Sequence, residues 1–195
     1  MEFDFDEAFY QRHYLDPETR VIGPDEVFRL AKFVTGYLEY LDVDVRDVLD
    51  LGCGIGLWRD ALRTLAPEAS YHGVETSGFL CERYGWERGS ITELDHLESV
   101  DLVVCQGVLQ YLTATEATKA IRSLARLTTG ALYLEVLTRE DWEENCAQDR
   151  TDGAVHLRKA SWYRRLLGPR FIAVGGGLFL PRDTHAVLYE LEKLG

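Results

Sequence analysis

The sequence predicts an α/β fold, with a doubly wound and mostly parallel sheet that ends in an antiparallel hairpin. Between residues 47 and 137, short apolar segments typical of buried strands alternate with amphipathic segments typical of helices. Such alternation requires crossover helices that cover both faces of a parallel sheet. After residue 170, two strand-like segments follow each other with no helix between them, so we expect them to be antiparallel neighbours.

Helices are predicted from apolar spacing and from signals at their ends. The first begins at Pro24, because proline suits the first helical position and acids at 25 and 26 suit the positive end of the helix dipole. Its apolar stripe is Val27, Leu30, Ala31, Val34, Leu38 and Leu41. Another helix begins at the capping-box pattern Thr113–Glu116 and ends at Gly130. The remaining helices are Leu57–Leu65, Ser77–Tyr84 and Ser161–Leu167.

Strands are predicted where short apolar runs lie between turn signals. They are Asp47–Leu51, Tyr71–Glu75, Val100–Cys105, Ala131–Leu137, Phe171–Val174 and His185–Leu191. The last two are separated by three glycines and by Pro181, which we expect to form a loop. No repeat, low-complexity tract or Gly/Ser linker divides the 195 residues, so the chain is predicted to form a single domain.

The charge of the chain restricts the class of its partners. It has 33 acidic and 21 basic side chains, a formal net charge of −12, and so acidic a surface repels phosphate backbones and anionic lipids. We therefore expect a small-molecule partner, with no nucleic acid and no membrane. The segment Met1–Tyr10 has four acids and no base, unlike an export signal, and the longest apolar run, Phe171–Leu180, is too short to span a bilayer.

The four cysteines are typical of a protein in a reducing compartment. Cys53, Cys81, Cys105 and Cys146 form no C-x-x-C pair and have no histidine at metal-ligand spacing. We therefore expect small buried thiols, no metal site and a cytoplasmic location. The sequence leaves the oligomeric state open.

The strongest local signal is a glycine-rich turn, Gly52–Gly56, that follows the first predicted strand. Its three glycines permit positive φ and let a ligand approach the backbone closely, and a predicted helix begins directly after them. Asp50 precedes the turn, and Glu75 ends the next strand, where a carboxylate can accept both hydroxyls of a ribose. A tight turn with no ligand is the alternative, and the two acids disfavour it.

These segments resemble the class I S-adenosylmethionine-dependent methyltransferase family. The resemblance is carried by Asp50–Gly56 (DLGCGIG), by Gly73–Glu75 (GVE) and by Asp101–Leu112, which looks like the family's fourth strand and the helix after it. It covers roughly residues 45 to 190. It implies a seven-stranded Rossmann-like sheet with one antiparallel strand, methyl transfer as the activity and S-adenosylmethionine as the cofactor.

The resemblance also implies a division of the chain into four parts. Residues 1–44 form a helical N-terminal cap, and residues 45–140 form the cofactor-binding core. Residues 141–170 cover the acceptor side, and residues 171–195 form the antiparallel hairpin.

Roles in binding the methionine half and the ribose follow from the same resemblance. The turn residues Gly52, Cys53, Gly54 and Gly56 would approach this part of the cofactor. Asp50 would orient its amino group, directly or through water, and Glu75 would hold the ribose hydroxyls.

Further residues would contact the two ends of the cofactor. Thr76 would lie against the adenine, and the backbone of Ile91 would contact it. Ser90 stands where the family often has an acid that accepts the adenine amino group, so a serine oxygen would take that bond. Gln106, directly after the fourth strand, would lie beneath the methionine moiety and close to the transferring methyl group.

A nicotinamide dinucleotide is the alternative ligand for such a turn. The dinucleotide pattern needs a third glycine at position 57, where this chain has Leu57 followed by Trp58. Asp50 would also repel a diphosphate, whereas S-adenosylmethionine carries no phosphate. The spacing therefore favours the sulfonium cofactor.

A general base is expected if the acceptor is a hydroxyl, an amine or an acidic carbon, because such acceptors lose a proton. His13 and His156 are the candidate bases, and Tyr111, one helical turn beyond Gln106, is a third candidate catalytic residue. His72, His96 and His185 are expected to be structural. Trp142 and Trp162 are candidate walls of the acceptor pocket.

The aromatic segment Phe9–Tyr14, together with Arg20, has two interpretations. In the first it is a lid in which Tyr14 contacts the cofactor and Arg20 pairs with the methionine carboxylate. In the second it is a surface helix held in place by its aromatic residues. The sequence does not choose between them.

The leading functional hypothesis is methyl transfer to an oxygen, nitrogen or carbon atom of a small molecule. Cys105–Val108 (CQGV) stands where enzymes that methylate amino groups of nucleobases or glutamine place Asn-Pro-Pro-Tyr or Asp-Pro-Pro-Tyr. A protein methyltransferase is one alternative. The other is a domain that binds the cofactor or a partner without turnover, because a cofactor site does not prove an acceptor site.

Overall fold

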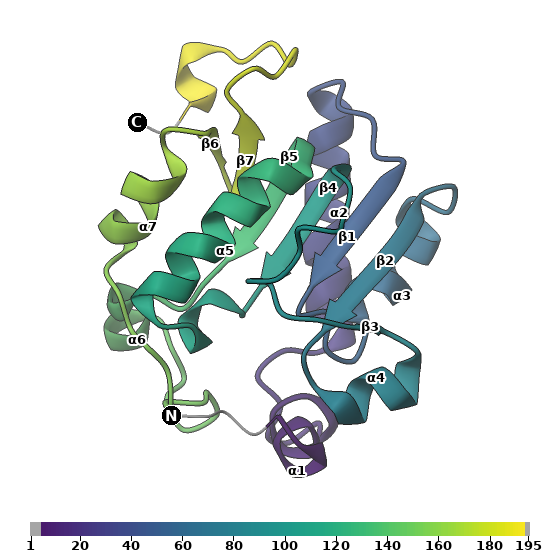
Figure 1. Cartoon of the computed structure of the whole chain (residues 1–195), viewed down its shortest axis with the longest axis vertical. Helices are drawn as coiled ribbons and strands as arrows, with labels where there is room; N and C mark the ends of the chain where they lie inside the picture. Colours follow the sequence, from purple (N-terminus) through teal and green to yellow (C-terminus); the bar gives the residue numbers. More distant parts are fainter. Residues whose placement is uncertain (1–4, 194–195) are drawn as a thin grey trace.

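A seven-stranded sheet forms the centre of the computed structural model, which describes residues 5–193 (Figure 1). The strands are β1 (Asp47–Leu51), β2 (Ser70–Glu75), β3 (Glu87–Arg88), β4 (Val100–Gln106), β5 (Thr128–Glu135), β6 (Phe171–Gly175) and β7 (Leu178–Pro181). Their order is β3-β2-β1-β4-β5-β7-β6. β1 to β5 pair in parallel, and β7 is antiparallel to both β5 and β6. The predicted fold class is confirmed.

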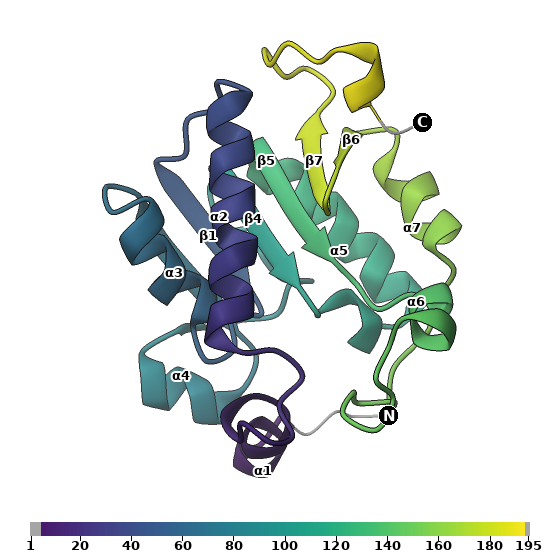
Figure 2. The ribbon, with the colours of Figure 1, turned by 180° about the vertical axis from the view of Figure 1, so that it is seen from behind.

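Helices cover both faces of the sheet, as Figures 1 and 2 show from opposite sides. α2 (Pro24–Tyr40) and α3 (Leu57–Leu65) lie on one face, where the apolar stripe of α2 packs in one core cluster with Val48, Leu102 and Leu180. α5 (Ala114–Leu127) and α7 (Ala160–Leu167) lie on the other face in a second cluster. The two clusters fix the positions of the strand ends.

Predicted end signals are confirmed at two helices. At α2, the N–H of Gly23 donates to Oε2 of Glu26 at 2.5 Å, and Pro24 is the first helical residue. At α5, Thr113 and Glu116 form the predicted capping box through reciprocal hydrogen bonds. These contacts satisfy N–H groups that have no partner within the helix.

The predicted end of α5 at Gly130 is wrong. The helix ends at Leu127, β5 begins at Thr128 with no connecting residue, and Gly130 lies inside the strand. A Cβ atom at Gly130 would lie 2.6 Å from the carbonyl oxygen of Asp101 on β4. This glycine therefore permits close approach of two strands, where the β4–β5 register is shifted, rather than ending a helix.

The second strand of the predicted hairpin is also wrong. Gly175–Gly177 forms a turn in which all three glycines have positive φ, and the chain returns at once as β7. His185–Leu191, predicted as that strand, is instead irregular and enters the short 3-10 helix η3 (Glu190–Glu192). Val187 is 75% exposed and Leu191 is 99% exposed, whereas Ala186 and Leu188 are partly buried against one core cluster, so the segment covers the core without entering the sheet. The hairpin exists, but its turn is shorter than predicted.

Several short elements surround the carboxyl ends of the parallel strands. They are α1 (Glu7–Tyr10), the π-helical turn η1 (Gln11–Leu15), α4 (Gly78–Tyr84), the 3-10 turn η2 (Leu109–Tyr111) and α6 (Arg139–Glu144). The helix α6 was not predicted, although Thr138 and Asp141 form a capping box at its start. Within residues 5–193 the structure contains no helix with the length and apolar character that crossing a membrane requires.

Candidate functional site

A large cavity opens at the carboxyl ends of β1 and β4, where the strand order reverses. In open α/β sheets, ligands bind at this switch point. The cavity has a volume of about 1380 Å³, above the roughly 300–1,000 Å³ of a typical small-molecule site. All the residues predicted to bind the cofactor or to act in catalysis, except Gly56, line it. The cavity therefore has room for a cofactor and an acceptor together.

The glycine turn places backbone groups at one wall of the cavity. Gly52, with φ of 73°, lies so close to Val108 that a Cβ atom would be 2.4 Å from its Cγ2. Nε1 of Trp86 donates to the carbonyl oxygen of Gly54 at 2.9 Å and holds the turn from outside. Gly56 lies under the Trp86 ring as the residue before α3, which explains why it does not line the cavity.

Glu75 lies at the carboxyl end of β2 and is 3% exposed. Its Oε1 accepts hydrogen bonds from the backbone N–H groups of Thr76 at 2.7 Å and Ser77 at 3.0 Å. Its Oε2 accepts one from the N–H of Gly54 at 2.9 Å. The carboxylate is thus fixed against the turn, and Oε2 keeps capacity for a ligand hydroxyl. The hydroxyl of Tyr10 donates to Oε1 at 3.4 Å from the N-terminal segment.

Asp50 is a buried carboxyl group on β1 that lines the same cavity. The hydroxyl of Tyr71 donates to its Oδ2 at 2.5 Å. Burial, with a smaller contribution from Glu75, raises the pKa of Asp50 from 3.8 to about 7, although the Tyr71 hydrogen bond opposes the shift. Asp50 therefore exchanges its proton near neutral pH, and a cationic ligand group beside it would favour the ionised form.

We expect this pKa to make cofactor binding depend on pH. The amino group of S-adenosylhomocysteine is a cation that favours ionised Asp50, so its affinity should fall up to about tenfold per pH unit below pH 7. Calorimetric titration with S-adenosylhomocysteine between pH 5 and 8 measures this. Asp50→Asn should remove the dependence, and an unchanged slope in that variant would contradict the assignment. Because the pKa of Asp50 is higher in the folded than in the unfolded chain, ionisation of Asp50 destabilises the fold. The free energy of unfolding of the unliganded protein should therefore decrease as the pH rises from about 4 to 7.

Residues predicted to hold the adenine lie together on one side of the cavity. Thr76, Ser90 and Ile91 all line it. The side chain of Ser90 pairs with Oγ1 of Thr92 at 2.9 Å, and Ile91 is 6% exposed. Ile91 therefore offers an apolar surface to the cavity, and Ser90 offers a hydroxyl whose position is fixed by Thr92.

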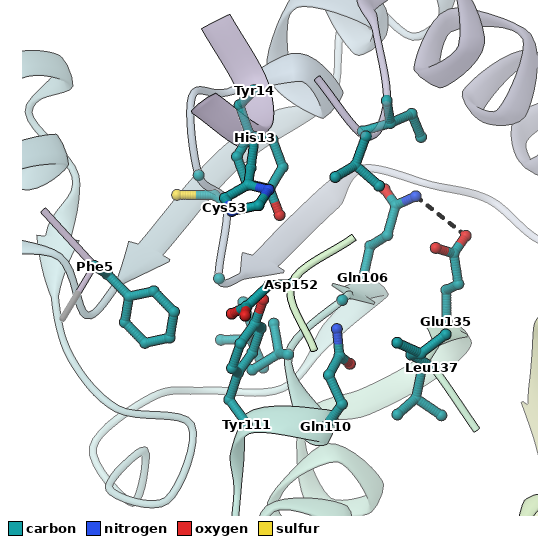
Figure 3. A pocket seen from close by; sticks show the side chains of 18 of the residues that line it. Phe5, His13, Tyr14, Cys53, Gln106, Gln110, Tyr111, Glu135, Leu137 and Asp152 are labelled. Atoms are coloured by element: carbon teal, nitrogen blue, oxygen red, sulfur yellow. Dashed lines mark hydrogen bonds between the residues drawn. The ribbon is translucent and has the colours of Figure 1, made fainter. Parts of the chain in front are cut away.

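Gln106 ends β4 in a network that the sequence did not reveal. Its Oε1 accepts from Nε1 of Trp58 at 2.8 Å, and its Nε2 donates to Oε2 of Glu135 at 3.2 Å (Figure 3). The hydroxyl of Tyr133 donates to the same Glu135 oxygen at 2.9 Å. Strand register places Gln106 beside Glu135, so the network follows from the β4–β5 pairing. It fixes the Gln106 amide at the floor of the cavity.

The candidate catalytic residues converge on the cavity from three segments. His13 comes from η1, Tyr111 from η2 and His156 from the chain after α6. Nδ1 of His13 lies 3.1 Å from the carbonyl oxygen of Arg150. Burial, together with Tyr14 and Asp152, raises the pKa of Tyr111, whose hydroxyl is hydrogen bonded to Asp152. Tyr111 therefore stays protonated and can donate a hydrogen bond but cannot act as a base at neutral pH.

The N-terminal segment, which contains α1 and η1, lies beyond the carboxyl ends of the strands and next to α4 (Figures 1 and 2). On the Glu75 side, Oγ of Ser77 donates to the carbonyl oxygen of Phe5 at 2.6 Å. On the opposite side, the Phe5 ring meets the Tyr111 ring edge-on at 5.1 Å. Tyr14 and Arg20 also line the cavity, and burial raises the pKa of Tyr14 to about 12. The segment thus contacts both walls.

Trp142 and Trp162 do not line the cavity, so the proposal that they form acceptor-pocket walls is wrong. Trp162 packs against the core beneath α5, with the guanidinium of Arg158 over its ring at 5.1 Å. Trp142 lies on α6, and its ring is close to Gly153. Trp162 therefore serves as a core aromatic, whereas Trp142 belongs to neither core cluster.

Fold and site together define a Rossmann-like domain with a ligand cavity at the switch point. Residues 48–130 match the family model described as a methyltransferase domain. Trans-aconitate 2-methyltransferase from Pseudomonas paraeruginosa is 25% identical over 172 residues, which is 83% of this chain and 55% of that protein. This chain therefore spans about half the length of that curated relative. These findings bear out the predicted resemblance to methyltransferases, and residues 48–130 are similar to a methyltransferase domain.

Solved structures show the same fold. An O-methyltransferase family protein from Burkholderia thailandensis has a TM-score of 0.58 and 15% identity, covering 83% of this chain and 59% of that one. Magnesium protoporphyrin IX methyltransferase from Synechocystis PCC 6803, with bound SAH, has a TM-score of 0.56 and 22% identity, covering 77% of each chain. A protein from Pyrococcus horikoshii OT3 has a TM-score of 0.63 and 14% identity, covering 91% of this chain and 100% of that one.

Proposed function

We propose that this chain transfers the methyl group of S-adenosylmethionine to an oxygen, nitrogen or carbon atom of a small-molecule acceptor. The observation that carries the proposal is the Glu75 carboxylate, fixed beside the glycine turn in a cavity large enough for two molecules. The sulfonium cofactor supplies an electrophilic methyl group. In the transfer, the S–CH₃ bond breaks with its electron pair going to sulfur, a bond forms to the acceptor atom, and a protic acceptor loses one proton.

The residues of the chain bind and orient rather than react. Glu75 would hold the ribose hydroxyls, Asp50 the amino group and Arg20 the methionine carboxylate. Gln106, held by its contacts with Trp58 and Glu135, would support the cofactor from below. His13 or His156 would take the proton of a protic acceptor. Alignment and exclusion of water would supply most of the rate, because displacement at a sulfonium needs little else.

Contacts across the cavity support a small-molecule acceptor over a protein. The N-terminal segment reaches the acceptor-side chain through His13 and Arg150 at 3.1 Å. It also reaches Tyr111 through the rings of Phe5 and Phe9. A cavity bridged in this way restricts access by a folded protein. We propose that residues 45–140 hold the cofactor, that residues 141–170 cover the acceptor, and that the chain acts in the cytoplasm.

Calorimetry with S-adenosylhomocysteine and with NADH tests the cofactor half of the proposal. We expect micromolar affinity for the first, about −8 kcal/mol, and no binding of the second. Transfer of tritium from methyl-labelled S-adenosylmethionine tests the activity, with trans-aconitate as the first acceptor because of the 25% identical relative. Failure to bind S-adenosylhomocysteine would overturn the proposal. Binding with no transfer to any small molecule would favour the protein-acceptor or non-catalytic alternative.

A further inference from the structure

The side-chain oxygen of Gln110 is buried and has no hydrogen-bond partner in the part of the chain that the structure describes. Gln110 is 8% exposed and belongs to η2, directly after β4. Its Oε1 is buried and accepts no hydrogen bond from residues 5–193. The Gln110 backbone is paired, because its carbonyl oxygen accepts from the N–H of His156 at 2.7 Å. The unpaired group is therefore the side-chain oxygen.

The position of this amide is next to the floor of the cavity. A Cβ atom built on Gly107 would lie 3.6 Å from Nε2 of Gln110, and Gly107 directly follows Gln106. Figure 3 shows the amide pointing toward Gln106, with Tyr111 and Asp152 on one side and Glu135 and Leu137 on the other. The amide therefore faces the space that the cofactor assignment leaves for the acceptor.

Leaving a buried amide unpaired destabilises a folded protein, since its water hydrogen bonds are lost without replacement. The neighbouring polar side chains form hydrogen bonds with other residues: Tyr111 is bonded to Asp152, and Glu135 accepts from Gln106 and Tyr133. A ligand oxygen in this space would accept a bond from Nε2, and a ligand hydroxyl could also donate to Oε1 after rotation of the amide.

We propose that Gln110 recognises the acceptor, and that the acceptor is an oxygenated small molecule whose hydroxyl or carboxylate oxygen bonds to this amide. This inference rests on the proposed methyl transfer. It assigns the choice of acceptor to a residue outside the cofactor half of the cavity, which is the part lined by Asp50, Glu75 and Gln106. Gln110 is a specificity-determining residue and takes no part in the transfer of the methyl group or the proton.

The first test uses Gln110→Leu and the exposed control Lys119→Leu on α5, neither of which alters a backbone hydrogen bond. Gln110→Leu should raise the melting temperature of the unliganded protein by about 3 °C, because it removes an unpaired polar group. It should leave the affinity for S-adenosylhomocysteine within about twofold of the original chain, and Lys119→Leu should change neither quantity. A fall in melting temperature would show that the amide serves the fold and would overturn the proposal. Weaker S-adenosylhomocysteine binding would place Gln110 in the cofactor half and would also overturn it.

The second test asks whether the acceptor oxygen belongs to a carboxylate or to a hydroxyl. It uses one probe of each kind, with the protein saturated with S-adenosylhomocysteine. Trans-aconitate presents carboxylate oxygens and catechol presents hydroxyls, and calorimetry measures the binding of each. The probe that binds should lose at least about tenfold in affinity in Gln110→Leu, because one hydrogen bond to a buried group is lost. Equal affinity in the variant, or no binding of either probe to the original chain, would overturn the assigned ligand class. Absence of S-adenosylhomocysteine binding in the first test would instead reject the proposed function.

Discussion

Glu75→Ala is expected to weaken the binding of S-adenosylhomocysteine by about 30- to 150-fold, which corresponds to about 2 to 3 kcal/mol. The side chain makes two contributions to the site. In the proposed function it would offer a charged acceptor to the ribose, and in the structure it accepts hydrogen bonds from the N–H groups of Gly54, Thr76 and Ser77. Without it, these donors lose their partner and the turn loses its fixed form. Calorimetry gives the affinity, and melting curves give the accompanying loss of stability.

One further variant separates these two contributions, and a second serves as its control. Glu75→Gln keeps the shape and one acceptor oxygen, so we expect a smaller loss of stability than in Glu75→Ala, with most of the affinity loss retained. Glu82→Ala removes an exposed carboxylate of α4 and should change neither quantity. Unchanged affinity in Glu75→Ala would reject the ribose role.

Removal of residues 1–20 is expected to lower the affinity for S-adenosylhomocysteine by at least about tenfold while lowering the melting temperature by only a few degrees. Among the described residues, the two apolar clusters of the core contain none before Ile22. The contacts of the segment fall instead on cavity residues, including Glu75 through Tyr10 and Arg150 through His13. The lid hypothesis therefore predicts a larger effect on binding than on folding.

Calorimetry and thermal melting of the same shortened protein decide between the two interpretations of the segment. A surface helix held only by its aromatics would leave the affinity unchanged. Tyr10→Phe, which removes the hydroxyl and keeps the ring, should change the affinity by less than about threefold, since the Tyr10–Glu75 hydrogen bond is long at 3.4 Å. A full loss in Tyr10→Phe would assign the effect to that hydroxyl and not to the covering segment.

Local signals explain why much of the site was predictable. The glycine turn, Asp50 and Glu75 lie within or directly after short buried strands, and the parallel sheet brings such strand ends to one edge. What stands around them depends on register, which the sequence does not encode locally. Tyr71 reaches Asp50 only because β2 lies beside β1, and Gln106 reaches Glu135 only because β5 lies beside β4.

Residues without a pattern were missed for a different reason. Gln110 lies in a 3-10 turn, where no periodicity marks its orientation, and its significance is its lack of a partner in three dimensions. The hairpin was misplaced because three consecutive glycines indicate a loop, whereas their positive φ values form a turn within a continuous strand pair. Gly130 was misread because close strand approach and helix termination both require glycine.

The direct passage from α5 into β5 has a consequence for how this architecture can diversify. At Leu127 and Thr128 no residue separates helix from strand, so an insertion there would displace either the helix or the central sheet. At the opposite end of β5, residues 136–159 contain α6 as their one regular element. Several of these residues line the cavity. Changes in chain length can accumulate there without disturbing the sheet. New acceptor preferences should therefore evolve in this stretch while the cofactor half stays unaltered.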